Sequence, residues 1–165
     1  MNLNNLFQNF CKKNNLEINT YQLTIIDKLK NYYNLNFNKS FLNKFFSKNN
    51  SKPAFYLHGG VGVGKTMILN FFFDLIEEKK LRKHFNEFML SFHNFAYERK
   101  EKNEENIINQ FVKDLKLKTK LIYFDEFQVT NIVDAMILGK LFEQIFKEDI
   151  KIILTSNIKI SELYK

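Results

Sequence analysis

Hydrophobic residues in the first third of the chain recur at helical spacing. Between Leu16 and Tyr33 they return every three or four positions, and a second, shorter run lies at residues 41–46. This spacing gathers apolar side chains on one face of a helix. We therefore expect residues 1–50 to form a helical N-terminal extension that packs over the next domain. Residues 49–53, which end in the only proline of the chain, are typical of a linker.

From Ala54 onward, strand-like and helix-like patterns alternate. Short apolar runs at 55–57, 121–124 and 150–155 predict buried strands, and the alternating residues 84–93 predict another. Alternation of strands with helices favours an α/β fold, in which a parallel sheet carries helices on both faces. The sequence thus predicts an α/β unit over residues 54–165.

Helical spacing covers three segments between these strands. They are residues 67–79, with an end near Leu81, residues 94–117, broken by the charged turn 100–105, and residues 134–147. Arg82 then falls between the first of these helices and the next strand. The apolar stripe predicted for the last helix consists of Met136, Ile137, Leu141, Ile145 and Phe146.

A glycine-rich sequence follows the first strand and ends in Lys-Thr. One glycine, four residues and then Gly-Lys-Thr is the P-loop pattern, in which backbone N–H groups surround the phosphates of a nucleotide. The lysine reaches the β- and γ-phosphate oxygens, and the threonine hydroxyl binds Mg²⁺. A glycine-rich turn without chemical consequence is the alternative, which the preceding strand and following helix disfavour. The candidate nucleotide-binding residues are Gly59, Gly60, Val61, Gly62, Val63, Gly64, Lys65 and Thr66.

Polar residues also follow two later strands. Asp125 and Glu126 come directly after residues 121–124, and Asn157 follows residues 150–155. Because ligands of parallel sheets bind at the carboxyl ends of the strands, we expect these residues to converge near Gly59. Asp125 would then hold Mg²⁺, usually through water, while Glu126 would polarise the attacking water and Asn157 would orient it. An ordinary solvated strand end is the alternative for the Asp-Glu pair. The predicted ligands are ATP and Mg²⁺.

Composition narrows the possible functions. The 165 residues, 45% of them apolar, suffice for one core, and the net charge of +7 permits an acidic partner. Lysine is spread along the whole chain while arginine occurs only at Arg82 and Arg99, so we expect no nucleic-acid patch. Cys11 is the single cysteine, which suits a reducing compartment. No apolar run of membrane-spanning length is present, and we expect a cytoplasmic protein.

Two competing site types are disfavoured. The Asp-x-x-Gly and Asn-Lys-x-Asp signatures of small GTPases do not occur in the sequence. His84 and His93 resemble a metal pair, but nine positions apart on the predicted strand they would point to opposite faces. We therefore expect no metal site at these histidines.

Four stretches of sequence resemble the AFG-like AAA+ ATPases, a family that includes the bacterial ZapE proteins. They are residues 58–67, 84–89, 123–139 and 154–165, of which Phe124-Asp-Glu-Phe-Gln-Val-Thr130 is the most specific. The resemblance is strong over 54–165 and weak at Asn19-x-x-Gln22, and Asn86 stands where the family commonly has histidine. It implies an ATPase whose first sensor is Asn157.

The resemblance also implies partners and a location. Members of the family remodel partner proteins as rings, acting on the division-ring tubulin homologue in bacteria and on inner-membrane protein turnover in mitochondria. A homo-oligomer, a protein client and a cytoplasmic location, or a peripheral one at the inner membrane, are therefore expectations from the resemblance. Composition and spacing do not indicate them.

The family pattern continues beyond the last residues, Tyr164-Lys165, with a further strand and a loop that carries an arginine finger. We therefore expect a carboxyl-terminally incomplete domain with an open sheet edge. Two functions remain open, an Mg²⁺-ATP-dependent ATPase and a nucleotide-binding remnant or interaction module without useful turnover. A DNA-loading AAA+ protein is a third, which would need a basic face that the sequence does not single out.

Overall fold

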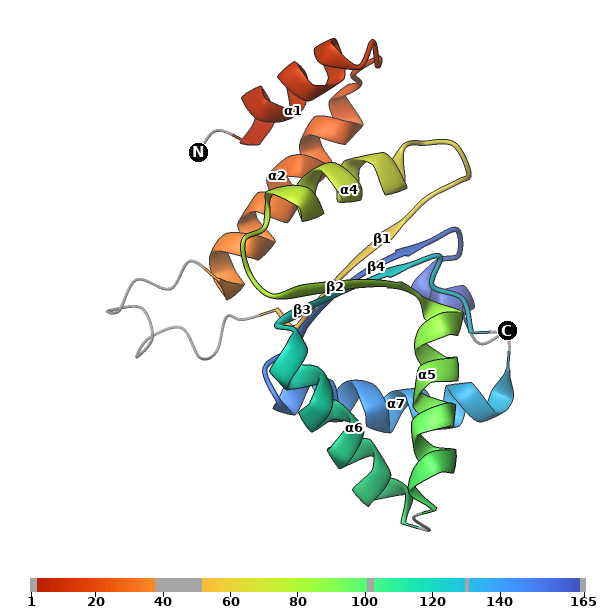
Figure 1. Cartoon of the computed structure of the whole chain (residues 1–165). Coiled ribbons are helices and arrows are strands. Elements are labelled where there is room, and N and C mark those ends of the chain that lie inside the picture. The colour runs from red at the N-terminus through yellow and green to blue at the C-terminus, as the bar shows by residue number, and fades with distance from the viewer. Residues whose placement is uncertain (1–2, 38–51, 101–102, 130, 164–165) are drawn as a thin grey trace.

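Four parallel strands form the centre of the protein, and helices cover both faces of the sheet (Figure 1). The structure is a computed structural model that describes residues 3–37, 52–100, 103–129 and 131–163. The strands lie in the order β1-β4-β3-β2. Their bounds are Ala54–His58 for β1, Lys80–His84 for β2, Leu121–Asp125 for β3 and Lys151–Ser156 for β4. The predicted parallel α/β fold is confirmed.

The α-helices of the described residues divide into two groups of three by the face that they cover (Figure 1). On one face lie α1 (Leu3–Lys13), α2 (Thr20–Asn36) and α4 (Lys65–Leu75). On the other face lie α5 (Phe85–Arg99), α6 (Glu104–Lys118) and α7 (Ile132–Lys147). A short 3-10 helix, Ile160–Glu162, follows β4.

The two central strands are buried along their whole length, which explains the apolar runs at residues 121–124 and 152–154. Successive residues of β3 face opposite sides of the sheet. Leu121 and Tyr123 join the apolar cluster under α4, whereas Ile122 and Phe124 join the cluster under α5, α6 and α7. Asp125 is the next residue after this alternation, at the carboxyl end of the sheet.

The N-terminal helices share the apolar cluster under α4. Phe7 of α1 and Ile26 and Leu29 of α2 are fully buried in it. A capping box starts α2: the Gln22 N–H donates to Asn19 Oδ1 at 2.9 Å, and the Asn19 N–H donates to Gln22 Oε1 at 3.2 Å. The division of the chain at residue 50 stays a prediction. The helical run at 41–46 and most of the linker at 49–53 lie outside the described residues.

The prediction of a strand over residues 84–93 is wrong. The strand is β2, Lys80–His84, and Phe85 begins α5. The buried residues of α5 return once per helical turn and comprise Phe85, then Phe88 and Met89, and then Phe92. The strand β2 escaped detection because charged residues surround its single leucine, as is common for the edge of a sheet. The preceding helix ends at Leu75 and not near Leu81.

This correction moves three side chains that the sequence analysis used. Arg82 lies within β2 instead of in a connection. His84 ends β2 and His93 lies on α5, so the argument that one strand points them to opposite faces does not apply. A break within the predicted range 100–105 does separate α5 from α6, although Glu104 and Glu105 already belong to α6.

The stripe predicted for α7 is also wrong at one position. Leu138, Leu141 and Ile145 are its buried residues, and Ile137 and Phe146 pack partly buried against the same cluster. Met136 is 74% exposed. It precedes Leu141 by five residues, which at 3.6 residues per turn places it on another face of the helix.

Substitutions of two adjacent residues test the corrected assignment of α5. Met89 is 2% exposed and Leu90 is 61% exposed, whereas a strand would have made Leu90 a core residue beside Phe88. We expect Met89→Ala to lower the free energy of unfolding by about 2–5 kcal/mol because it leaves a cavity. Leu90→Ala should change it by less than about 0.5 kcal/mol. Urea-induced unfolding measures both, and equal losses would contradict the helix.

Candidate functional site

The glycine-rich loop joins the end of β1 to the start of α4. Gly62 and Gly64 have φ angles of 81° and 87°, a left-handed conformation that residues with a side chain rarely adopt. Gly64 is the N-cap of α4 and supplies no side-chain hydrogen bond to the first turn. The N–H groups of that turn are therefore available to a ligand, and the helix dipole favours an anionic one.

Lys65 links the loop to the end of β4. Its Nζ donates hydrogen bonds to the carbonyl oxygens of Gly59 at 2.8 Å and Gly60 at 2.7 Å. It also donates to Asn157 Oδ1 at 2.8 Å. Two residues that lie 92 positions apart in the sequence are thus in direct contact at the carboxyl edge of the sheet.

A pocket of about 290 Å³ lies at this edge. Most of the predicted site residues line it: Val61, Gly62, Gly64, Lys65, Thr66, Asp125, Glu126 and Asn157. Gly59, Gly60 and Val63 belong to the same loop but do not line the pocket. Met67, Thr155 and Ser156 line it without having been predicted. The residues that follow the three strands therefore lie together in the structure, as expected. The role of each residue stays a prediction.

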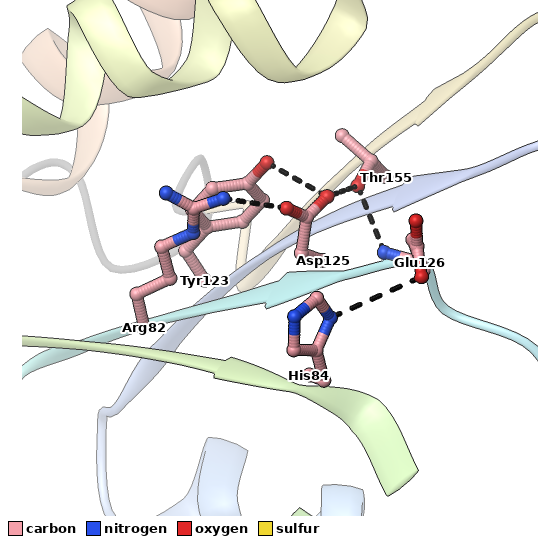
Figure 2. A network of polar contacts seen from close by, with 6 residues as sticks. All are labelled: Arg82, His84, Tyr123, Asp125, Glu126 and Thr155. Carbon is pink, nitrogen blue, oxygen red and sulfur yellow. Dashed lines mark hydrogen bonds and ion pairs between the residues drawn. The ribbon is translucent and has the colours of Figure 1, made fainter. Parts of the chain in front are cut away.

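Asp125 is 4% exposed and accepts hydrogen bonds from three strands (Figure 2). Arg82 Nη2 of β2 lies 2.6 Å from Oδ2. The hydroxyl groups of Tyr123 and Thr155 donate to Oδ1 at 3.1 and 2.8 Å. Burial raises the pKa of Asp125, but the hydrogen bonds from Arg82, Thr155 and Tyr123 together hold it below its ordinary value. Asp125 is therefore a carboxylate at neutral pH.

Glu126 has the opposite environment although it is the next residue. Its side chain is 78% exposed, and its backbone φ of 54° is left-handed, which is uncommon for a residue with a side chain. The Glu126 N–H donates to Thr155 Oγ1 at 3.2 Å, and the Phe127 N–H donates to Thr155 O. These bonds hold the turn that directs Glu126 out of the sheet. His84 Nδ1, at the end of β2, lies 4.0 Å from Glu126 Oε2 (Figure 2).

The oxygen ligands at the pocket fit Mg²⁺. Mg²⁺ prefers hard oxygen ligands and commonly binds through one or two carboxylates together with substrate phosphates. The hydroxyl-bearing Thr66 and the ionised Asp125 line the same pocket. Within the described ranges, no three His, Cys, Asp or Glu side chains lie close enough to hold a metal by themselves. The arrangement therefore suits a cation that arrives with phosphates better than a cation held by protein alone.

A second hollow, of about 310 Å³, lies beside the same loop. The connection between α1 and α2 forms one wall, and Val63, Gly64 and Met67 form another. Leu16 and Ile18 line the first wall, and Gln22 at the start of α2 also lines the hollow, so both apolar and amide side chains surround it. Sequence reasoning placed the N-terminal helices over the domain but did not assign these residues to a site.

The fold and this loop define the class of protein. A parallel sheet with a P-loop between β1 and α4 and an Asp-Glu pair at the carboxyl end of β3 defines a P-loop NTPase of the AAA+ class. The fold is similar to that of DnaI, with a TM-score of 0.54 at 16% identity over 91% of this chain and 73% of that one. Domain III of the replication initiation protein DnaA from Thermotoga maritima gives a TM-score of 0.51 at 17% identity, over 81% and 59% of the two chains.

Comparison of sequences identifies the family within this class. The model of the AFG1-like ATPase family matches residues 7–165, and the chain belongs to that family. It is 39% identical over 129 residues to lactation elevated protein 1 homolog B of Danio rerio and 38% identical over 122 residues to cell division protein ZapE of Escherichia coli K12. Each match covers 72% of this chain but only 26% and 32% of those proteins. The resemblance noted in the sequence is confirmed.

None of the helices in the described residues is long and apolar enough to cross a bilayer.

Thr155 offers a test of the polar network, because its hydroxyl bonds to Asp125 and to the Glu126 N–H at the same time. Thr155→Val keeps the shape but leaves both groups without this partner, so the free energy of unfolding should fall by about 1–3 kcal/mol. Thr155→Ser keeps the hydroxyl and is the control. Chemical denaturation that finds the two variants equally stable would contradict the role given to the hydroxyl.

Proposed function

We propose that the chain binds ATP with Mg²⁺ at the pocket between the glycine-rich loop and the ends of β3 and β4, and hydrolyses it. The observation that carries this proposal is the contact between Lys65 Nζ and Asn157 Oδ1 at 2.8 Å. It brings the loop, the start of α4 and the polar end of β4 to the same place. Membership of an ATPase family supports the reaction type.

The phosphates would bind over the glycine-rich loop. The N–H groups of the first turn of α4 and the Lys65 ammonium supply hydrogen bonds and positive charge there. Lys65 now donates to loop carbonyls and Asn157, and the same Nζ can donate to phosphate oxygens. Thr66 and Asp125 would hold Mg²⁺, which when bound neutralises phosphate charge.

Glu126 is the residue that we propose to accept a proton from the attacking water. It lines the pocket with an exposed carboxylate, and its backbone is fixed by Thr155. Asn157, at the end of β4, would orient the water. Asp125 is occupied by three donors and is less suited to take up a proton. The exposed carboxylate thus handles the proton and the buried one stays charged.

The base of the nucleotide would bind in the second hollow. Its apolar residues Leu16, Ile18 and Met67 offer a surface for a flat ring, and Gln22 and Asn19 carry amide groups beside it. The hollow shares Gly62, Gly64 and Met67 with the phosphate pocket, so the two pockets adjoin at the loop.

We further propose that the whole protein uses hydrolysis to remodel partner proteins as a homo-oligomer in the cytoplasm. Similarity to a cell division protein supports a bacterial client such as the division-ring tubulin homologue. The chain spans about a quarter to a third of the length of its curated relatives, so client and assembly are properties to test on the whole protein.

Lys65→Ala tests nucleotide binding. The variant loses the full positive charge of the loop, and we expect it to abolish detectable binding of ADP with Mg²⁺ in calorimetry. Lys28→Ala removes the charge of an exposed lysine on α2 and should bind as the unaltered chain does. Undiminished affinity in Lys65→Ala would exclude the assignment of the loop.

Glu126→Gln separates binding from chemistry. The amide keeps the size of the side chain but not its basicity, so nucleotide affinity should stay roughly unchanged and turnover should fall by about 10²–10⁴-fold. Phosphate release measures turnover, and Asp125→Asn is the comparison, since it should weaken Mg²⁺-dependent binding. The division of roles is refuted if both variants lose binding equally. Absence of turnover from a chain that binds ATP would instead support the binding-module alternative.

A further inference from the structure

The two oxygens of Asp125 have different partners. Oδ1 accepts from the neutral hydroxyl groups of Tyr123 and Thr155, at 3.1 and 2.8 Å. Oδ2 is bound by the Arg82 guanidinium at 2.6 Å. Among the contacts that the described residues make with Asp125, Arg82 is the only charged one. Orientation and charge balance of this carboxylate are therefore supplied by different side chains.

Arg82 reaches Asp125 from the edge strand and not from the pocket. In the register of β2 and β3, Arg82 lies opposite Tyr123, and its guanidinium sits 5.2 Å from the centre of the Tyr123 ring. Asp125 lines the phosphate pocket, whereas Arg82 does not. Figure 2 shows the guanidinium on the side of Asp125 away from Thr155 and Glu126. The arginine can thus bind Asp125 without filling the space of a nucleotide.

The pair is unequally buried. The Asp125 side chain is 6% exposed, and the Arg82 side chain is 39% exposed. Burying a carboxylate without a counter-charge is costly, and two hydroxyl groups provide hydrogen bonds but no net charge. Arg82 provides the charge at a smaller desolvation cost, because much of its side chain remains in water.

We propose that Arg82 takes the place of Mg²⁺ as the positive charge beside Asp125. It neutralises Asp125 while the pocket holds no Mg²⁺-nucleotide, and its charge repels Mg²⁺ when the Mg²⁺-nucleotide binds. This inference rests on the proposed function. Two cations beside one carboxylate repel each other, so the arginine raises the Mg²⁺ concentration needed for binding. Without Arg82, Tyr123 and Thr155 still hold Oδ1, so Asp125 keeps its orientation toward the pocket. Arg82 therefore sets the Mg²⁺ requirement through its charge beside Asp125 and not through the orientation of that carboxylate.

The test is the variant Arg82→Gln. The measurement is the binding of fluorescent ADP at increasing Mg²⁺ concentration, and turnover is not needed. We expect half-maximal binding at an about tenfold lower Mg²⁺ concentration, equivalent to ~1.4 kcal/mol. The melting temperature in EDTA should fall, and Mg²⁺-ADP should raise it by more than it does in the unaltered chain. Arg82→Lys keeps the charge and should keep the original Mg²⁺ requirement.

The chain offers a matched control. Arg99 is the other arginine, stacks on Phe95 and lies 3.8 Å from Asp114, away from the pocket residues. Arg99→Gln should leave the Mg²⁺ requirement unchanged. Arg82→Gln combined with Asp125→Asn should recover part of the stability lost in EDTA, because the uncompensated charge is gone.

The outcomes separate the two proposals. An unchanged or higher Mg²⁺ requirement in Arg82→Gln overturns the role proposed for Arg82 but leaves the proposal of nucleotide binding intact. Absence of Mg²⁺-dependent binding in the unaltered chain overturns both. An Arg82→Gln variant that is unfolded in EDTA but folded with Mg²⁺-ADP supports the role. A variant unfolded in both, even with Asp125→Asn, shows that the sheet needs the arginine itself and overturns it.

Discussion

Asp125 places a negative charge inside the protein, and three strands must be aligned to stabilise it. Arg82 comes from β2, Tyr123 from β3 itself and Thr155 from β4. Side chains of a strand alternate between faces, so a slip of one residue in β2 would turn Arg82 toward α5. The register that pairs Arg82 with Tyr123 is therefore set by electrostatics as well as by apolar packing. Site and sheet depend on the same contacts.

The backbone conformation gives the adjacent carboxylates of Asp125 and Glu126 different environments. Asp125 ends a buried strand, and one residue later the left-handed φ of Glu126 turns the chain out of the sheet. The same functional group is consequently enclosed by donors at one position and open to the pocket at the next. Pairs of carboxylates in different environments are a common way to divide acid-base work from charge stabilisation.

The parts of the structure that sequence could predict are those with fixed spacing or two buried faces. The loop from Gly59 to Thr66 follows a spacing rule, and β3 and β4 carry apolar runs at residues 121–124 and 152–154 because both faces of these strands are covered. The edge strand β2 has no such signal, since its residues are mostly charged. Without β2, the contact between Arg82 and Asp125 could not be predicted, because it depends on strand register. Thr155 lies two positions before Asn157 in the sequence, but its two hydrogen bonds depend on how β3 and β4 align and could not be predicted.

Gly64 is constrained from two directions, and this limits how the sequence of the loop can drift. Its φ of 87° disfavours any side chain, and an added Cβ would lie 3.3 Å from Nε2 of Gln22, at the start of α2. Gly60 has no positive φ, and a Cβ there would meet nothing within 4 Å. Substitutions should therefore accumulate unevenly among glycines that look equivalent in the sequence. Gly64 is therefore the glycine of the loop that is least free to change, and Gln22 of α2 adds a steric restriction to the one that the backbone already imposes.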